Sequence, residues 1–157
     1  MRITHSFEGL NIPTIPITVR GPVAAYGDHQ FNAGVDAGFT AFLSLPFFDA
    51  VKPGLIFSGV MPLTLADGKP TSFLYCLGQV QIGEKQEIGV IVISPSDDAL
   101  VGMEFLRQFG FHLEIDPTAN TVTLDDHLAE ELPLDASPPG DSPGVSPEAP
   151  PAPPSST

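Results

Sequence analysis

Short runs rich in Val, Ile, Phe and Thr recur along the first 125 residues, separated by Gly, Pro, Asn or Asp. Runs of this length and composition, bounded by turn-forming residues, are typical of β-strands joined by hairpins. The pattern therefore predicts an all-β domain. The predicted strands are residues 12–20, 30–35, 42–45, 61–65, 71–77, 79–82, 88–93, 111–115 and 121–124.

Three segments between these strands have the composition of turns. They are residues 66–69 (ADGK), 83–85 (GEK) and 116–120 (DPTAN). Gly, Asn and Asp tolerate the backbone angles of tight turns, and Pro presets one of them. We expect a hairpin at each of the three.

Apolar residues recur at helical spacing over residues 98–109, DALVGMEFLRQF. Asp97 or Asp98 can cap the N-terminus of this helix, and Gly110 can end it. A second, short helical turn is predicted at residues 46–51.

Proline is concentrated near the C-terminus. Nine of the 18 Pro fall in residues 133–157, together with Ser, Gly, Ala and acids but no Lys or Arg. Such a segment buries too little apolar surface to offset the entropy lost on ordering. We therefore expect one domain over residues 1–128 and a disordered, acidic, Pro-rich tail over residues 129–157. The PPAPP run in this tail suits a polyproline-binding groove or a solvated spacer.

The formal net charge is −13, and the acids from Asp125 onward supply seven of the 19. No basic patch is present, so nucleic-acid binding is not expected. No apolar run approaches 18 residues, so no membrane span is expected, and the first residues lack the apolar stretch of a signal peptide. With a single cysteine, Cys76, a cytoplasmic protein is the prediction.

Cys76 lies within a strand pattern and is expected to be a buried small hydrophobe, because no convincing His partner would make it a nucleophile. The four histidines are scattered without metal-ligand spacing. Neither a metal nor a cofactor is expected.

Residues 35–46, VDAGFTAFLSLP, place Asp36, Ala37 and Gly38 directly after an apolar run. A carboxylate carried toward a protein interior must be paired, hydrogen-bonded or neutralised, so Asp36 is a candidate functional residue. Gly38 allows a sharp turn beside it. The alternative interpretation is a turn carboxylate that only caps the end of a strand.

Two motifs in this order resemble the retropepsin-like aspartic proteases, the single-lobed relatives of pepsin that act as homodimers. VDAGFTAFLSLP resembles the catalytic segment of the cellular and bacterial branch, and ALVGMEFLRQFG resembles the second signature, two apolar residues and a Gly at the start of a helix. The resemblance covers roughly residues 12–125. It implies a closed acid-protease barrel with one short C-terminal helix that packs behind the catalytic loop.

The resemblance also implies the chemistry and the site. Asp36 from each of two chains would be the catalytic pair, sharing one proton across a water molecule that attacks a peptide bond, with Ala37 and Gly38 supporting the loop. The hairpin over residues 61–75 would be the flap, with Leu65, Ala66, Asp67 and Gly68 near its tip, and Asp97 and Asp98 would line a substrate pocket. Two acids there suggest tolerance for a basic side chain.

The chain departs from the family pattern at three positions. Ala37 stands where the family has Thr or Ser, whose hydroxyl makes hydrogen bonds across the dimer. Thr40 and Met103 replace an Asp and an Arg that form an ion pair in viral members. Two functions therefore stay open: an aspartic endopeptidase that acts on a protein or peptide as a homodimer, and a non-catalytic dimer that binds peptides or mediates interactions.

Overall fold

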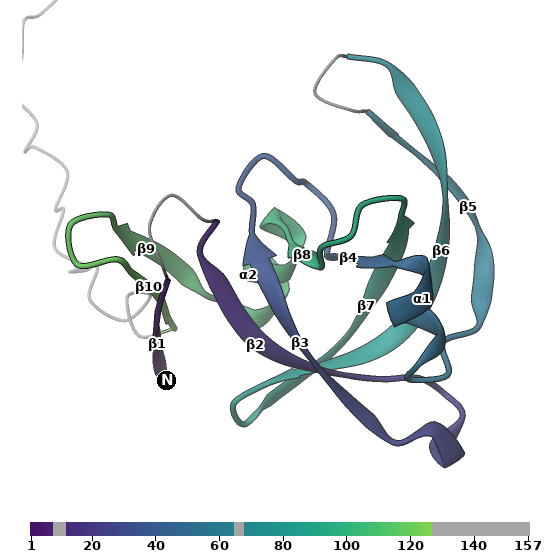
Figure 1. The fold of residues 1–157 in the computed structure, drawn as a ribbon, viewed down its shortest axis with the longest axis horizontal. Coiled ribbons are helices and arrows are strands. Elements are labelled where there is room, and N and C mark those ends of the chain that lie inside the picture. Colours follow the sequence, from purple (N-terminus) through teal and green to yellow (C-terminus); the bar gives the residue numbers. More distant parts are fainter. Residues whose placement is uncertain (8–11, 65–67, 127–157) are drawn as a thin grey trace, which may run out of the picture.

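A computed structural model describes residues 1–7, 12–64 and 68–126 of the chain (Figure 1). The elements, in chain order, are β1 (Arg2–Ser6), β2 (Thr14–Arg20), η1 (Ala24–Tyr26), β3 (Asp28–Val35), β4 (Leu43–Pro46), α1 (Phe47–Val51), β5 (Phe57–Thr64), β6 (Pro70–Ile82), β7 (Lys85–Ser94), β8 (Leu100–Val101), α2 (Met103–Phe109), β9 (His112–Asp116) and β10 (Thr121–Asp125). The expectation of a mostly β chain with a short helix near residue 105 is confirmed.

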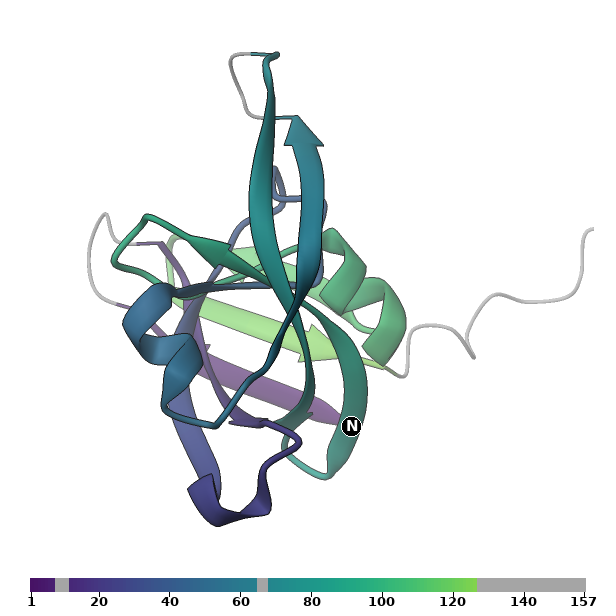
Figure 2. The same ribbon diagram turned by 90° about the vertical axis from the view of Figure 1, so that its right-hand side faces the viewer.

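Six strands form a closed barrel. The larger sheet has the order β2-β3-β8-β4-β7-β6-β5, and β2 also pairs with β6, which closes a ring of strands and leaves β5 outside it. The β5–β6 hairpin extends beyond the barrel (Figures 1 and 2). Closing the ring removes the free edges that an open sheet of this size would expose.

Strand β6 closes the barrel because it pairs with two different strands along its length. Its first half pairs with β5 up to Cys76, and its second half pairs with β2 at residues 79–81. Gly78 lies at the change of partner, where an added Cβ would come within 2.7 Å of Ile91 Cδ1 and Leu55 Cδ2. The prediction of two strands, 71–77 and 79–82, is wrong here: this Gly makes room for core side chains without interrupting the strand.

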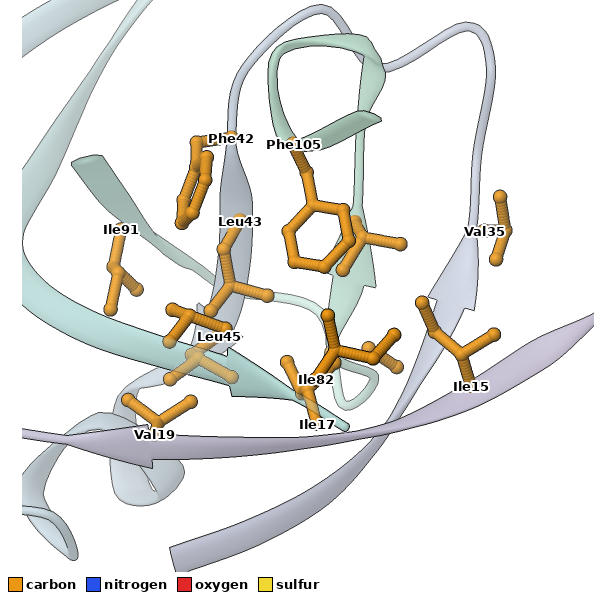
Figure 3. Close-up of a cluster of buried hydrophobic side chains, with 14 of the residues drawn as sticks. Ile15, Ile17, Val19, Val35, Phe42, Leu43, Leu45, Ile82, Ile91 and Phe105 are labelled. Carbon is orange, nitrogen blue, oxygen red and sulfur yellow. The ribbon is translucent and has the colours of Figure 1, made fainter. Parts of the chain in front are cut away.

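The barrel interior follows the alternation that the sequence predicts. On β2, Ile15, Ile17 and Val19 point inward and are at most 1% exposed. Side chains from β3, β4, β6, β7 and α2 meet them in one cluster (Figure 3). Burial of each such side chain contributes about 1.5–3 kcal/mol, so the continuous interior stabilises the whole ring.

Helix α2 is joined to the barrel by aromatic rings. The Phe105 ring lies 5.4 Å from the Phe42 ring and 4.5 Å from the Phe109 ring, measured between centroids. Gly89 on β7 provides the space for Phe42, because a Cβ there would lie 2.2 Å from that ring. The face of α2 that carries Phe105 and Phe109 is therefore fixed to the barrel.

A second sheet has the order β1-β10-β9, with antiparallel pairing throughout. Strand β1 was not expected, because Arg2–Ser6 carries a single large apolar residue, Ile3. Its neighbour β10 supplies the apolar side chains, with Val122 and Leu124 fully buried. Tertiary pairing thus creates a strand that local composition does not indicate.

The helix predicted over residues 98–109 begins later than expected. Leu100 and Val101 form β8, which pairs with β3 on one side and with β4 on the other. The N-cap of α2 is Gly102, so neither Asp97 nor Asp98 caps this helix. Gly110 ends it in the left-handed conformation, φ 67°, as predicted.

The turns and the short helix agree with expectation where the structure describes them. Strands β6 and β7 are joined at Gly83 and Glu84, β9 and β10 at residues 117–120, and α1 matches the predicted helical turn. Strands β5 and β6 pair up to Thr64 and Pro70, while residues 65–67 lie outside the described residues. The predicted tail, residues 129–157, also lies outside them. None of the described helices has the length and apolar composition needed to cross a bilayer.

Asp126 links the two sheets. Its Oδ2 lies 2.7 Å from Lys85 Nζ at the start of β7, and its Oδ1 pairs with the amino group of Met1. The same Lys85 ammonium donates to the Phe109 carbonyl oxygen at 2.9 Å. The hydrogen bond from Lys85, followed by that from the Met1 amino group, holds the pKa of Asp126 far below its usual range.

We predict that Asp126→Asn lowers the free energy of unfolding at pH 7, and that its difference from the wild type shrinks as the pH falls from about 5 toward 3. Because the folded-state pKa is depressed, the contribution is complete above the unfolded-state pKa of about 4 and is lost progressively as the pH falls toward the lower folded-state pKa. Urea unfolding at several pH values measures this. Asp97→Asn, which removes an exposed carboxylate, is the control; a difference independent of pH for Asp126→Asn would contradict the prediction.

Candidate active site

Asp36 opens the loop that connects β3 to β4. Its N–H donates to the Val101 carbonyl oxygen at 3.0 Å, and its own carbonyl oxygen accepts from Phe39 N–H at 3.1 Å. The first bond continues the pairing of β3 with β8, and the second makes a tight turn. The loop therefore leaves the barrel at a fixed point, the end of the short strand β8.

The Asp36 carboxylate is oriented by the loop itself. Its Oδ1 accepts a hydrogen bond from Gly38 N–H at 2.8 Å. An added Cβ at residue 38 would lie 3.2 Å from this same oxygen, so Gly keeps the contact unhindered. Within the part of the chain that the structure describes, Oδ2 has no hydrogen-bond partner and Asp36 has no ion pair. One oxygen is thus fixed and the other is available to a proton, a water molecule or a second carboxylate.

The loop presents this carboxylate toward the outside of the molecule. Asp36 is half-buried, whereas Ala37 and Gly38 are exposed. Ala37 and Thr40 also line an open depression of about 550 Å³, whose other walls are α2 and the start of β9, including Met103 and Leu113. The side of the loop next to Asp36 is therefore an uncovered surface.

The N-terminus of α2 holds the loop in place. Met103 N–H donates to the Phe39 carbonyl oxygen at 2.8 Å, and Glu104 N–H donates to the Thr40 carbonyl oxygen at 3.3 Å. The first N–H groups of a helix have no partner within the helix, and here no side chain caps them. The loop carbonyls replace the missing cap, so loop and helix satisfy each other's backbone groups.

Gly102 permits this approach. An added Cβ at this residue would lie 2.2 Å from the Phe39 carbonyl oxygen and 2.3 Å from the Ala41 carbonyl oxygen. Its φ of −115° is open to any residue, so Gly is required by space and not by backbone angle. The packing of a helix start behind the Asp36 loop, which the resemblance implied, is therefore observed in this chain.

Asp97 and Asp98 lie in the connection from β7 to β8. Both are exposed, and neither forms an ion pair with any of the residues that the structure describes. Gly34 N–H donates to the Ala99 carbonyl oxygen at 2.8 Å, so this connection runs beside the end of β3. The two acids thus lie on the connection that runs beside the strand leading into Asp36, and their role in a substrate pocket stays a prediction.

Of the four residues predicted at the flap tip, Gly68 is described, whereas Leu65, Ala66 and Asp67 lie outside the described residues. Gly68 has φ 77°, and its position is open to solvent, with no atom within 4 Å of an added Cβ. The backbone angle explains this Gly, because L-residues with a side chain rarely adopt it. The β5–β6 hairpin itself is present and stands above the barrel (Figure 2).

The face of this hairpin that continues the barrel interior carries Val60 and Leu74. Leu74 is two residues from the buried Cys76 on β6, so both share one face, and Val60 is the cross-strand partner of Leu74. Val60 is 61% exposed and Leu74 is 44% exposed. These two candidate contact residues were missed in the sequence; the spacing of Leu74 from Cys76 carries a signal, whereas Val60 is placed only by its pairing with Leu74.

Other candidate chemistry is weak in the described residues. Cys76 is fully buried, and burial raises the pKa of its thiol, which disfavours the nucleophilic thiolate. Among residues 1–7, 12–64 and 68–126, no group of three or more His, Cys, Asp or Glu could hold a metal ion. The Asp36 loop is the candidate site that the geometry favours.

No family model matches the chain, and no curated protein matches it. Chains of solved structures do match it. One is the EIAV protease complexed with the inhibitor HBY-793, with 10% sequence identity and a TM-score of 0.49; the match covers 68% of this chain and 95% of that chain.

We predict that Gly102→Ala lowers the free energy of unfolding by about 1–3 kcal/mol, the usual cost of overpacking. The added methyl group would collide with two loop carbonyls and displace the loop from α2. Gln108→Ala, at an exposed position of the same helix, is the control and should change stability by about 0.5 kcal/mol or less. Urea unfolding compares the variants; equal stabilities would show that the loop can move without cost.

Proposed function

We propose that the chain is a retropepsin-like aspartic endopeptidase that works as a homodimer, with one Asp36 from each copy. The observation that carries the proposal is the Asp36 carboxylate: one oxygen is fixed by Gly38 N–H, the other is available, and the loop rests on the N-terminus of α2. The two sequence motifs that resemble the family meet at this point. The barrel contains one such loop, so a pair of carboxylates requires a second copy.

In such a dimer the two carboxylates would share one proton, because two adjacent negative charges disfavour each other. The ionised carboxylate takes a proton from a bound water molecule, and the oxygen of that water molecule attacks the peptide carbonyl carbon. The protonated carboxyl gives its proton to the carbonyl oxygen, which forms a tetrahedral diol. The proton taken from water is then delivered to the peptide nitrogen as the C–N bond breaks. The other carboxylate takes back a proton from a diol hydroxyl, which yields a carboxyl and an amine and restores the single shared proton of the pair.

The surface beside Asp36 supports the pairing of two copies. Ala37, Gly38 and Thr40 are exposed, and the adjoining depression has a mainly apolar lining that includes Met103 and Leu113. An apolar, uncovered surface next to a catalytic group suits contact with another chain. A second copy placed there would bring the two Asp36 side chains toward each other.

The β5–β6 hairpin would contact the substrate. Val60 and Leu74 on its inner face would pack on an extended peptide, and closure of the hairpin would exclude water from the bond that is cleaved. Asp97 and Asp98, unpaired in the described part of the chain, would accept a basic side chain of the peptide.

A second function is favoured by Ala37. Its methyl group cannot make the hydrogen bonds that a Thr or Ser hydroxyl would make between the two loops, and each such bond is worth about 1 kcal/mol. A dimer whose paired loops are loose would bind peptides yet cleave them slowly, since catalysis depends on exact positioning. The alternative function is therefore a peptide-binding dimer without effective catalysis.

We predict that Asp36→Asn lowers kcat/KM for peptide cleavage by roughly 10²–10⁴-fold, the usual contribution of general acid–base catalysis. The amide can neither take nor give the required proton. A fluorogenic peptide library assayed between pH 4 and 7 measures the rate, and circular dichroism checks the fold. Glu84→Gln, at an exposed carboxylate in the β6–β7 turn, is the control and should retain cleavage; cleavage that survives Asp36→Asn would exclude the proposed mechanism.

We predict that Ala37→Thr lowers the dissociation constant of the dimer about five- to thirtyfold, because it restores one or two hydrogen bonds of about 1 kcal/mol each. Sedimentation velocity across a dilution series measures this, with Ala41→Thr in the same loop as the control. Cleavage by Ala37→Thr but not by the wild type would support a disabled protease. If wild type, Asp36→Asn and Ala37→Thr all form dimers and none cleaves, only the binding function remains.

A further inference from the structure

Five large apolar side chains between residues 47 and 57 are exposed. Phe48 is 77% exposed, Ile56 56%, Phe47 45%, and Val51 and Phe57 are 42% each. Single exposed apolar residues are ordinary, but a group confined to one short segment marks an interaction surface. We refer to Phe47, Phe48 and Phe57 as the aromatic patch; it lies on α1 and at the start of β5.

The three rings of the aromatic patch are in contact. Phe48 stands edge-on to Phe47, with centroids 5.5 Å apart and planes at 86°, whereas Phe57 is stacked beside Phe47 at 5.8 Å and 13°. Two nearly parallel rings and one perpendicular ring form a corner with aromatic walls. Phenylalanine has no hydrogen-bonding group. A peptide ligand would therefore contact these rings through C–H groups, and its backbone would keep its hydrogen bonds to water.

A polyproline II helix fits that requirement. It is preformed, its backbone is solvated, and proteins recognise it with aromatic-lined grooves. Residues 150–154 of this chain read PPAPP, in which Pro151 and Pro154 are three residues apart. Three residues make one turn, so the two rings would share a face about 9 Å apart. Phe48 and Phe57 each contact Phe47, with centroids 5.5 Å and 5.8 Å away, so the patch offers more than one aromatic ring to such a face.

We propose that residues 150–154 dock on the aromatic patch of the same chain. The segment from Asp126 to Pro150 spans up to about 70 Å at 3.1 Å per residue. A domain of this size has a radius of gyration of about 14 Å, so the docking segment reaches any point on its surface. A covalent tether of this kind gives an effective concentration near the millimolar range, and a weak contact therefore suffices.

Charge does not decide for or against this occupant. Residues 127–157 carry no Lys or Arg, and Glu148 lies just before the PPAPP run. Lys52, directly after α1, is 54% exposed, but its Nζ already lies 2.6 Å from Asp49 Oδ1. The aromatic rings and the length of the tether therefore carry the proposal.

A second exposed apolar surface, formed by Leu77 and Ile88 beside Gly78, is lined also by Arg20, Pro22 and Gln79 and by no aromatic residue. It lacks aromatic faces for proline rings and provides a matched control.

The test uses the full chain labelled with ¹⁵N. The amide resonances of Ala149, Ala152 and Ser155 are compared with those of a synthetic peptide of residues 145–157. If the segment docks, the resonances of the full chain differ from those of the peptide. The Phe48→Ser change should then move the resonances of the full chain more than halfway to the peptide positions. Ile88→Ser, at a side chain that is 70% exposed, should leave them unchanged.

Three results would overturn the proposal: resonances equal to those of the peptide in the wild type, resonances that Phe48→Ser does not move, or resonances that change on tenfold dilution. The last would indicate a second copy as the occupant. The variant with Pro151→Ala and Pro154→Ala leaves the domain unchanged, so it separates docking from a folding defect of Phe48→Ser. Its resonances should equal those of a synthetic peptide that carries the same two changes, and a difference between the two would contradict the proposal. The proposal does not depend on peptidase activity.

Discussion

The backbone contact between the Asp36 loop and the N-terminus of α2 is the constraint on which the site depends. Helix N–H groups and loop carbonyls, each without a partner in their own element, satisfy one another across Gly102. On its other side the helix is fixed to the barrel through Phe42 and Phe105. The position of a single carboxylate is thus set by the aromatic core of the barrel, through one helix start and one residue without a side chain.

Much of this arrangement could be predicted from the sequence, because the residues that create it are constrained locally. Asp36 with Gly38 needs a turn, and the apolar pair before Gly102 needs a buried position next to a helix. Alternating apolar residues on β2 face the interior as predicted. Each of these features depends on residues that are close together in the sequence, so it can be predicted without knowledge of the fold.

Other features depend on distant partners and could not be predicted in this way. The pair Leu100 and Val101 suits a helix as well as a strand, and it becomes β8 because β3 and β4 leave a gap of one strand between them. Strand β1 exists because β10 supplies the apolar neighbours. The composition of residues 47–57 is that of a core segment, and only the fold shows that Phe48 remains uncovered.

Strand β6 is longer than the part of it that β7 supports. Strand β7 pairs with β6 only from Tyr75 onward, and between Pro70 and Leu74 the only described partner of β6 is β5. A two-stranded ribbon in water is marginally stable by itself, whereas a strand inside a larger sheet is held on both sides. Tyr75 therefore marks the boundary between a ribbon that depends on its own two strands and a closed ring in which neighbouring strands support one another.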